Sequence, residues 1–253
     1  MEWQTVTPVA STDAEQLVEL IRARQPCVVL TGAGVSTESG IPDFRSPTGI
    51  WAQYDPMEVA SIWGFERDPK AVWEFYGRRL GVLADARPNA AHHALAELER
   101  RGLVTALVTQ NIDTLHEQAG SQEVVEVHGS IRTASCQACR VRVPMDEVVL
   151  RLPVPTCEAC GATLKPDVVM FGEAMPVRET DRAFELARGA ALLLVVGSSL
   201  EVYPVAALPE ETLAAGGALA IVNRGPTALD DRAVLRVEGA AGDVLGALVE
   251  ALG

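Results

Sequence analysis

Short runs of apolar and β-branched residues alternate along this chain with amphipathic stretches of helical period. The runs that predict strands lie at residues 27–34, 104–111, 123–129, 192–200, 218–223 and 233–239. The clearest helical patterns lie at residues 14–24, 89–102, 178–189 and 243–252. Apolar strands separated by helices favour a parallel sheet that helices cover on both faces. We therefore predict an α/β fold of the doubly wound, Rossmann-like class.

Two segments interrupt this alternation and predict a second, smaller lobe that binds zinc and contains helices. Residues 49–87 are helix-like and rich in aromatic side chains, while residues 131–164 contain four cysteines and several prolines. We expect the first to be a helical insertion and the second a zinc-binding insertion. The Rossmann-like domain is then assembled from residues 1–48, 88–130 and 165–253.

Composition narrows the class of partner. The chain has 253 residues, of which 48% are hydrophobic and 22% charged, as is typical of globular enzymes. Its formal net charge of −13 repels phosphate backbones, so nucleic acid is not an expected partner, whereas lysine-bearing peptides suit such a surface. No run of about 18 apolar residues and no basic, apolar leader pattern is present, so we expect neither a membrane partner nor secretion.

Four of the five cysteines form two C-x-x-C pairs that are separated by 17 residues: Cys136, Cys139, Cys157 and Cys160. This spacing is typical of a closed tetrahedral zinc site, in which no ligand position is left for water, so the metal would be structural. Two disulfides or four free thiols are the alternatives. An odd cysteine count without a secretion signal favours a reducing, cytoplasmic location. Cys27 is expected to be a core residue.

A glycine-rich loop follows the strand at residues 27–31. It contains Gly32, Ala33, Gly34 and Ser36 and continues through Asp43, Phe44 and Arg45. Glycines at a strand end let backbone amides approach a pyrophosphate closely. The dinucleotide fingerprint G-x-G-x-x-G is not met, because Thr37 occupies the third glycine position. The loop is therefore either a nucleotide site or a tight turn, and its polar continuation resembles a loop that folds over a ligand.

Polar residues also follow the other predicted strands. They are Gln110, Asn111, Ile112 and Asp113 after one strand, His128 after the next, and Gly197, Ser198, Ser199, Asn223, Arg224 and Gly225 after two more. Each of these groups alone is typical of a turn or cap. Because ligands of open α/β sheets bind beyond the carboxyl ends of the strands, their common placement predicts a nucleotide site.

Together these motifs resemble the sirtuin family. The matching segments are GAGVS at 32–36, GIPDFR at 40–45, TQNID at 109–113, the two C-x-x-C pairs, KPDVVMFGE at 165–173, GSSLEVYP at 197–204 and GAAGDV at 239–244. The resemblance covers nearly the whole chain in the family's order. It implies NAD-dependent removal of acyl groups from protein lysines, with NAD as co-substrate and nicotinamide, free lysine and O-acyl-ADP-ribose as products.

The resemblance also implies residue roles. His128 matches the catalytic histidine, a general base on a ribose hydroxyl, and Asn111 and Asp113 match the catalytic pair that orients ribose and nicotinamide. His92, His93 and His116 match no catalytic position and are expected on helix surfaces. The implied NAD contacts are Gly32, Ala33, Gly34, Ser36, Asp43, Phe44, Arg45, Trp51, Gln110, Asn111, Ile112, Asp113, Gly197, Ser198, Ser199, Asn223, Arg224, Gly225 and Ala241. The implied peptide contacts are Val168, Phe171, Gly172, Glu173, Leu200 and Val202, on two strands that sandwich the peptide.

Tyr76 and Arg79 bear on the acyl group. At positions i and i+3 of a helical pattern they share one face, which is otherwise apolar. A guanidinium there can bind a carboxylate with two hydrogen bonds, whereas the alternative is a tyrosine at the core edge beside a snorkelling arginine. The pair resembles the Y-x-x-R pattern of the sirtuin branch that removes succinyl and malonyl groups, and Ala60 matches that branch's small residue. We therefore predict deacylation of acetyl-lysine and succinyl-lysine.

Three other functions remain open at this point. An NAD-dependent oxidoreductase would share the fold class, although the chain lacks a full glycine fingerprint. A zinc-ribbon interaction module would need no polar residues at the strand ends. ADP-ribosyl transfer to protein would use the same activated sugar, so tagged NAD would mark an acceptor protein.

Overall fold

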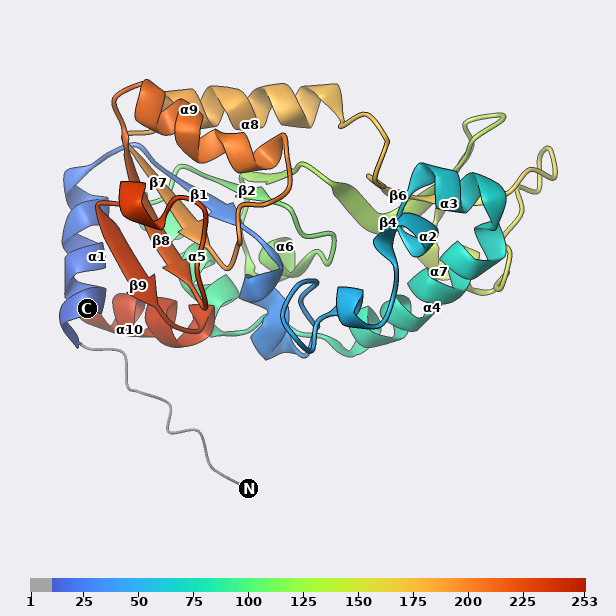
Figure 1. The fold of residues 1–253 in the computed structure, drawn as a ribbon. Helices are drawn as coiled ribbons and strands as arrows, with labels where there is room; N and C mark the ends of the chain where they lie inside the picture. Colours follow the sequence, from blue (N-terminus) through green and yellow to red (C-terminus); the bar gives the residue numbers. More distant parts are fainter. Residues whose placement is uncertain (1–10) are drawn as a thin grey trace.

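The computed structural model describes residues 11–253 and confirms the predicted fold class, with a larger α/β lobe and a smaller lobe (Figure 1). The larger lobe contains a six-stranded sheet in the order β3-β2-β1-β7-β8-β9, whose paired strands are all parallel. Its strands are β1 (Cys27–Thr31), β2 (Ala106–Thr109), β3 (Val124–Glu126), β7 (Leu192–Val196), β8 (Ala218–Asn223) and β9 (Leu235–Glu238).

Helices cover both faces of this sheet (Figure 1). One face carries α1 (Ser11–Ala23), α5 (Ala90–Arg100) and α10 (Ala241–Leu252), and the other carries α8 (Val177–Gly189) and α9 (Leu208–Ala214). The short helix α6 (Leu115–Ala119) follows β2, and 3-10 helices lie at Ala33–Ser39, Ile50–Ala52, Val205–Ala207 and Asp230–Arg232. Because both faces are covered, the central strands β1 and β7 are buried at every position rather than at alternate ones.

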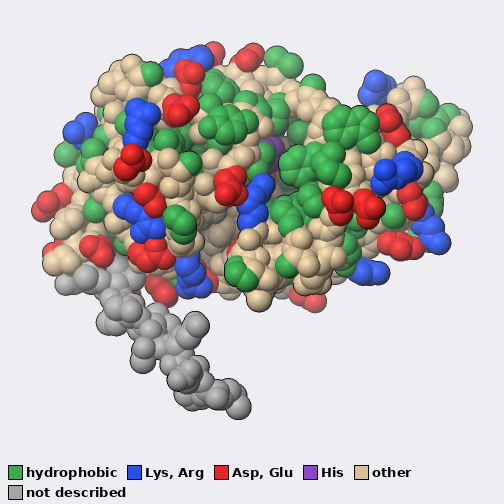
Figure 2. All heavy atoms as spheres, viewed as in Figure 1, with side chains coloured by type: hydrophobic (Ala, Val, Ile, Leu, Met, Phe, Trp, Pro, Cys, Tyr) green, Lys and Arg blue, Asp and Glu red, His purple; other side chains and the backbone are tan. Residues whose placement is uncertain are grey.

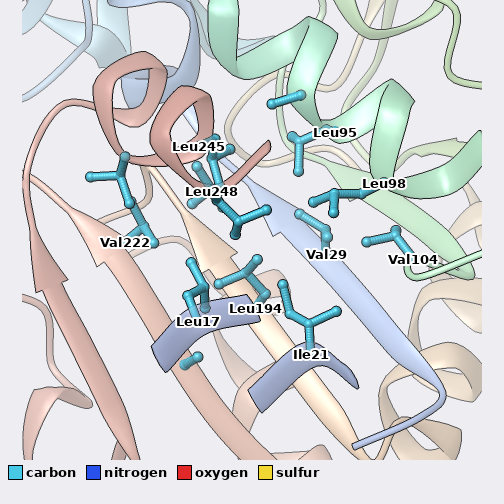
Figure 3. Close-up of a cluster of buried hydrophobic side chains, with 14 of the residues drawn as sticks. Leu17, Ile21, Val29, Leu95, Leu98, Val104, Leu194, Val222, Leu245 and Leu248 are labelled. Carbon is cyan, nitrogen blue, oxygen red and sulfur yellow. The ribbon is translucent and has the colours of Figure 1, made fainter. Parts of the chain in front are cut away.

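The core under the first face shows why the amphipathic helices dock as they do (Figure 3). One side of each helix supplies leucine and isoleucine, which pack against β-branched and leucine side chains of the strands. The labelled residues are Leu17, Ile21, Val29, Leu95, Leu98, Val104, Leu194, Val222, Leu245 and Leu248. Burying one such side chain contributes about 1.5–3 kcal/mol, so this layer fixes the sheet that carries the site.

The smaller lobe joins the two segments that interrupt the alternation of strands and helices. Its antiparallel sheet, in the order β5-β4-β6, packs with four helices around Trp73, whose indole N–H donates to the Leu164 carbonyl at 2.8 Å. The elements are β4 (Gly129–Cys136), β5 (Arg142–Pro144), β6 (Leu164–Val168), α2 (Pro56–Val59), α3 (Ile62–Arg67), α4 (Pro69–Asp85) and α7 (Met145–Val149). The exact domain boundaries stay a prediction.

The predicted carboxyl ends of several strands were wrong, because the observed strands end earlier. The cause is the same in each case. The runs at 27–34 and 192–200 end as strands at Thr31 and Val196, because the glycines that follow turn the chain. The run at 123–129 splits into β3 and the first residue of β4. The apolar patterns continue into the loops after the strands, where the backbone no longer forms the hydrogen bonds of the sheet. Among residues 11–253 no helix has the length and apolar character needed to cross a membrane.

Candidate functional site

The site begins where the strand order reverses. β1 pairs with β2 on one side and with β7 on the other. The next strands in sequence, β3 and then β8 and β9, are added at opposite edges of the sheet. Such a switch point opens a crevice at the carboxyl ends of the strands. Gly34 donates its amide hydrogen to the Gly197 carbonyl at 2.8 Å, and a Cβ built on Gly34 would lie 2.8 Å from the Gly197 Cα. These glycines are therefore required by close backbone approach at the crevice.

Ser36 holds the predicted catalytic pair together. Its hydroxyl donates to Asp113 Oδ2 at 2.7 Å and accepts from Asn111 Nδ2 at 3.1 Å. Asn111 Nδ2 also donates to the Gly32 carbonyl, and Asp113 Oδ1 accepts from the Leu115 amide. Ser36, Asn111 and Asp113 are all buried. Residues from the ends of β1 and β2 thus form one polar cluster with fixed side-chain orientations.

The expected surface placement of His92 and His116 is wrong. Both are almost fully buried, with ring centroids 4.8 Å apart, whereas His93 is exposed. His92 Nδ1 accepts from the Asn89 amide at the start of α5, so Nε2 carries the hydrogen and faces Ser36 Oγ at 3.4 Å. Asn89 and His92 are N-cap and N3 of a capping box, a spacing that marks the start of α5 but does not show that the His92 ring is buried.

His116 supports the neighbouring strand end. Its Nε2 lies 3.0 Å from Thr31 Oγ1, and the Thr31 hydroxyl in turn donates to Thr109 Oγ1 at 2.8 Å. Thr109 Oγ1 also accepts from the Asn111 amide. Burial lowers the pKa of His92 to about 4 and that of His116 to about 3, so both rings are neutral near pH 7. Burial raises the pKa of Asp113, against the hydrogen bonds from Leu115 and Ser36 that favour its carboxylate.

His128 lies between β3 and β4 and is partly buried. Its Nδ1 is 3.0 Å from the Gln110 carbonyl oxygen, which can only accept, so Nδ1 carries the hydrogen and Nε2 keeps its lone pair. Burial lowers the pKa of His128 from 6.5, and the bond to Gln110 opposes that shift. Gln110 Nε2 donates to Ser198 Oγ at 2.9 Å, which ties this histidine to the end of β7.

The segment after Gly40 folds back on itself beside the crevice. The Trp51 amide donates to the Phe44 carbonyl at 2.9 Å, and the two rings lie 5.0 Å apart. Asp43 Oδ1 accepts from the Ser46 amide. Arg45 Nε forms an ion pair with Glu201 Oε2 at 2.8 Å, joining this segment to the loop after β7. In the space-filling view the hollow between the lobes has hydrophobic side chains on both sides and a histidine in its depth (Figure 2).

The remaining predicted NAD contacts lie at the same edge of the sheet. Asn223 ends β8, and its Nδ2 donates to the Gly225 carbonyl at 3.0 Å, which shapes the loop around the exposed Arg224. Ala241 is the buried first residue of α10. Close glycines, amides, hydroxyls and one carboxylate around a switch point are groups that fit a dinucleotide. The individual NAD and peptide contacts stay predictions.

The predicted acyl residues come from α2 and α4. Tyr76 is buried and Arg79 is partly buried, with its guanidinium 4.9 Å above the Phe44 ring and 5.7 Å from the Phe75 ring. Ala60 is nearly buried at the end of α2, where its carbonyl accepts from the Phe171 amide. Arg79 also lines a cavity of about 160 Å³ between α4 and the segment after Gly40.

The four predicted zinc ligands converge at the end of the smaller lobe's sheet. Their Sγ atoms all lie within 4.8 Å of one another. The two C-x-x-C turns have the same backbone pattern: the Cys136 amide donates to the Val141 carbonyl, and the Cys157 amide donates to the Ala162 carbonyl, both at 2.8 Å. Four thiolates bound at about 2.3 Å would lie roughly 3.8 Å apart, so the cluster fits one tetrahedral zinc. Cys27 is buried in the larger lobe, as expected.

Comparison with known proteins identifies the family. The profile described as Sir2 family matches residues 32–204. The chain belongs to the Sir2 family. Among its relatives, the NAD-dependent protein deacylase of Pyrococcus furiosus is 43% identical over 240 residues, which cover 93% of this chain and 96% of the relative. NAD-dependent protein deacylase 2 of Archaeoglobus fulgidus is 46% identical over 242 residues, which cover 94% and 95%.

Solved Sir2 structures have the same fold. A complex of Sir2 with a p53 peptide and NAD+ matches with a TM-score of 0.87 at 38% identity, covering 93% of this chain and 96% of that one. Sir2Tm bound to a propionylated peptide also matches with a TM-score of 0.87 at 38% identity, covering 93% and 97%. The likeness extends over both lobes of the Sir2 chain.

Replacing His128 by Ala is expected to lower kcat of this Sir2 chain by at least about 100-fold, the usual contribution of a general base. Nicotinamide release from NAD and an acetylated peptide measures it, with the exposed His93→Ala as the control that keeps activity. Because burial lowers the pKa of His128, the acidic limb of the wild-type pH profile of kcat/KM should lie below pH 6.5. An acidic limb above that pH would contradict this role.

The buried histidines predict acid sensitivity. The unfolded chain protonates histidine near pH 6.5, but the folded chain does so only near pH 4 for His92 and pH 3 for His116. The free energy of unfolding should therefore fall as pH drops from 6.5 to 4, by up to about 1.4 kcal/mol per pH unit for each histidine. Urea unfolding at several pH values tests it. His116→Gln should reduce the slope, and an equal reduction by exposed His93→Gln would refute the assignment.

Removing zinc is expected to destabilise the smaller lobe, because four thiolates without their ion no longer hold β4 and β6 to the second C-x-x-C turn. Metal analysis should find one zinc per chain, and a chelator or Cys157→Ser should remove it and lower the melting temperature. Cys27→Ala should keep its zinc. A chelated protein with an unchanged melting temperature would argue against a structural metal.

Proposed function

We propose that this Sir2-family chain is an NAD-dependent protein deacylase that removes succinyl or malonyl groups from lysine as well as acetyl groups. The observation that carries the wider acyl range is Arg79. Arg79 is partly buried near Tyr76, and within residues 11–253 its guanidinium forms no hydrogen bond or ion pair with a carboxylate. A partly buried cation that contacts aromatic rings but no anion is incompletely compensated, so an anionic acyl chain would supply the missing charge.

The deacylase activity itself is supported by family membership and by the site. Relatives at 43% and 46% identity are named NAD-dependent protein deacylases. NAD, when bound, supplies the ribose that accepts the acyl group. His128 Nε2 then takes the proton from a ribose hydroxyl, because the Gln110 carbonyl fixes the hydrogen on Nδ1. Asn111 and Asp113 orient the sugar through side chains that Ser36 already holds in place.

Tyr76 can donate a further hydrogen bond to the acyl carboxylate, beside the two from Arg79. Burial raises the pKa of Tyr76 to about 12, so its hydroxyl stays protonated and can donate a hydrogen bond to an anion. Burial lowers the pKa of Arg79, while attraction from Asp113 opposes that shift. An arginine remains charged even so, and its planar fork matches a carboxylate better than a lysine would. Ala60 matches the small residue of the branch that removes succinyl groups, and a small side chain there would leave room for a longer acyl chain.

An alternative role for Arg79 is to hold the segment after Gly40, which contains the predicted NAD contact Phe44. Its guanidinium lies 4.9 Å from the centre of the Phe44 ring, and such a cation–π contact contributes about 0.5–1 kcal/mol or more when desolvated. In that case Arg79 would act on NAD binding and affect every acyl substrate alike. The two roles therefore differ in which substrate loses activity.

Replacing Arg79 by Met keeps the apolar stem but removes the charge. We expect kcat/KM for a succinylated peptide to fall at least about 30-fold, because a desolvated charge-assisted pair is lost, while the value for the acetylated peptide changes less than about threefold. The adjacent Arg78 is exposed and donates to the Tyr54 hydroxyl, so Arg78→Met is a matched control for a lost surface charge.

Product analysis separates the outcomes. Mass spectrometry of reactions with and without NAD should show free lysine peptide, nicotinamide and O-acyl-ADP-ribose for both acyl groups. An equal fall for both peptides in Arg79→Met, with a raised KM for NAD, would assign Arg79 to the segment after Gly40. Absence of succinyl activity in the wild type would reject the wider acyl range, and transfer of tagged NAD to protein would favour ADP-ribosylation.

A further inference from the structure

A buried lysine lies under the segment predicted to bind the substrate peptide. Lys165 is on β6, and its side chain is only 6% exposed. Its ammonium is 3.0 Å from the Pro166 carbonyl oxygen, 2.9 Å from that of Val168 and 2.9 Å from Glu173 Oε2. A lysine ammonium has three donors, so all of them are used. Lysine is rarely buried unless it is paired, and here the pairing is complete.

The partner carboxylate closes a turn at the far end of this segment. Glu173 Oε2 also accepts from the Met170 amide at 2.8 Å, and the Glu173 amide donates to the Met170 carbonyl at 3.0 Å. The turn contains Gly172 at φ 86°, a conformation that glycine adopts without strain. Lys165 therefore ties the start of the segment, at Val168, to its end.

The rest of the segment is bound along one edge only. The Val169 amide donates to the His128 carbonyl at 2.9 Å. The Phe171 amide donates to Ala60, and its carbonyl accepts from Ile62. Figure 1 places this stretch between the lobes, on the path from β6 to α8.

Gly172 is exposed in this turn, as is the neighbouring Phe171. No backbone hydrogen bond involves the amide or the carbonyl of Gly172 within the described part of the chain. The Trp63 ring packs so closely that a Cβ on Gly172 would lie 2.5–2.8 Å from three ring atoms. Trp63 is itself 55% exposed. A free backbone amide and carbonyl beside an aromatic wall are suited to pairing with an extended peptide.

We propose that Lys165 is a positioning residue for the acyl-lysine peptide. By holding Glu173 against the Met170 amide, it keeps the turn in the one shape that presents Gly172 to the substrate. The inference rests on the proposed function, since it concerns the peptide of that same site. A segment already ordered loses less conformational entropy when the peptide adds to it, so the effect should appear in peptide binding.

The test is peptide affinity in variants of the full chain. Lys165→Met leaves the partly buried Glu173 carboxylate without its cation and endangers folding, so a second variant, Lys165→Met with Glu173→Leu, removes both charges. For each folded variant we expect KM and the anisotropy Kd of a labelled acetyl-lysine peptide to rise at least about tenfold, with the KM for NAD within about twofold. Hydrogen exchange at the Met170 amide should accelerate. Arg188→Met, which breaks the exposed Arg188–Glu211 pair, should change none of these values.

The outcomes separate this inference from the proposed function. Use of an acetylated peptide makes the test independent of succinyl activity, and anisotropy does not require turnover. A wild-type chain that neither binds nor deacylates the acetyl peptide overturns the proposed function and the role of Lys165 with it. Variants that fold and bind the peptide as tightly as the wild type overturn Lys165 positioning alone. An equal rise in KM for NAD and peptide would show general destabilisation and would also overturn it.

Discussion

The reversal of strand order between β1 and β7 is the constraint on which the rest of this structure depends. Adjacent parallel strands whose connections run in opposite directions leave a crevice at their carboxyl ends. The backbones there approach so closely that only glycine fits at Gly34 and Gly197. Every other strand of the large sheet then adds its terminal residues to the same edge. The site is assembled by topology, from residues that are distant in sequence.

What the topology brings together is mostly polar and buried, which is unfavourable unless each group finds a partner. Ser36 resolves this for the centre of the site, since its single hydroxyl contacts Asn111, Asp113 and His92. The neutral His92 matters because a charged ring could not accept from the Asn89 amide. The predicted catalytic side chains are therefore oriented before any substrate arrives, and little reorganisation is needed during reaction.

Much of the fold and the zinc cluster could be predicted from the sequence, because both follow from short-range regularities. The period of apolar residues gave α1, α5, α8 and α10 within a few residues but missed the shorter α6, α7 and α9, and the spacing of Cys136 to Cys160 gave the four-thiolate cluster. The burial of His92 and His116 could not be predicted in this way. Helical periodicity places a residue on a face, but only the packing of α5 and α6 against the strand ends makes that face an interior one.

The ends of the strands and the polar pairs between distant residues also could not be predicted from the sequence. An apolar run does not show where a strand ends, because β1 and β7 end where the glycines that follow them come into contact, as in the Gly34–Gly197 hydrogen bond. Lys165 was part of a recognised motif, yet its buried pairing with Glu173 depends on how the turn between them closes. Such contacts arise from tertiary geometry and have no signature in local composition.

The ion pair between Arg45 and Glu201 bears on the order in which NAD and the peptide bind. It connects the two loops on either side of the crevice, yet both side chains are well exposed, at 38% and 56%. Exposed pairs of this kind contribute at most about 1 kcal/mol and weaken with salt. Thermal motion therefore opens the contact readily, so it imposes no order of arrival on NAD and peptide.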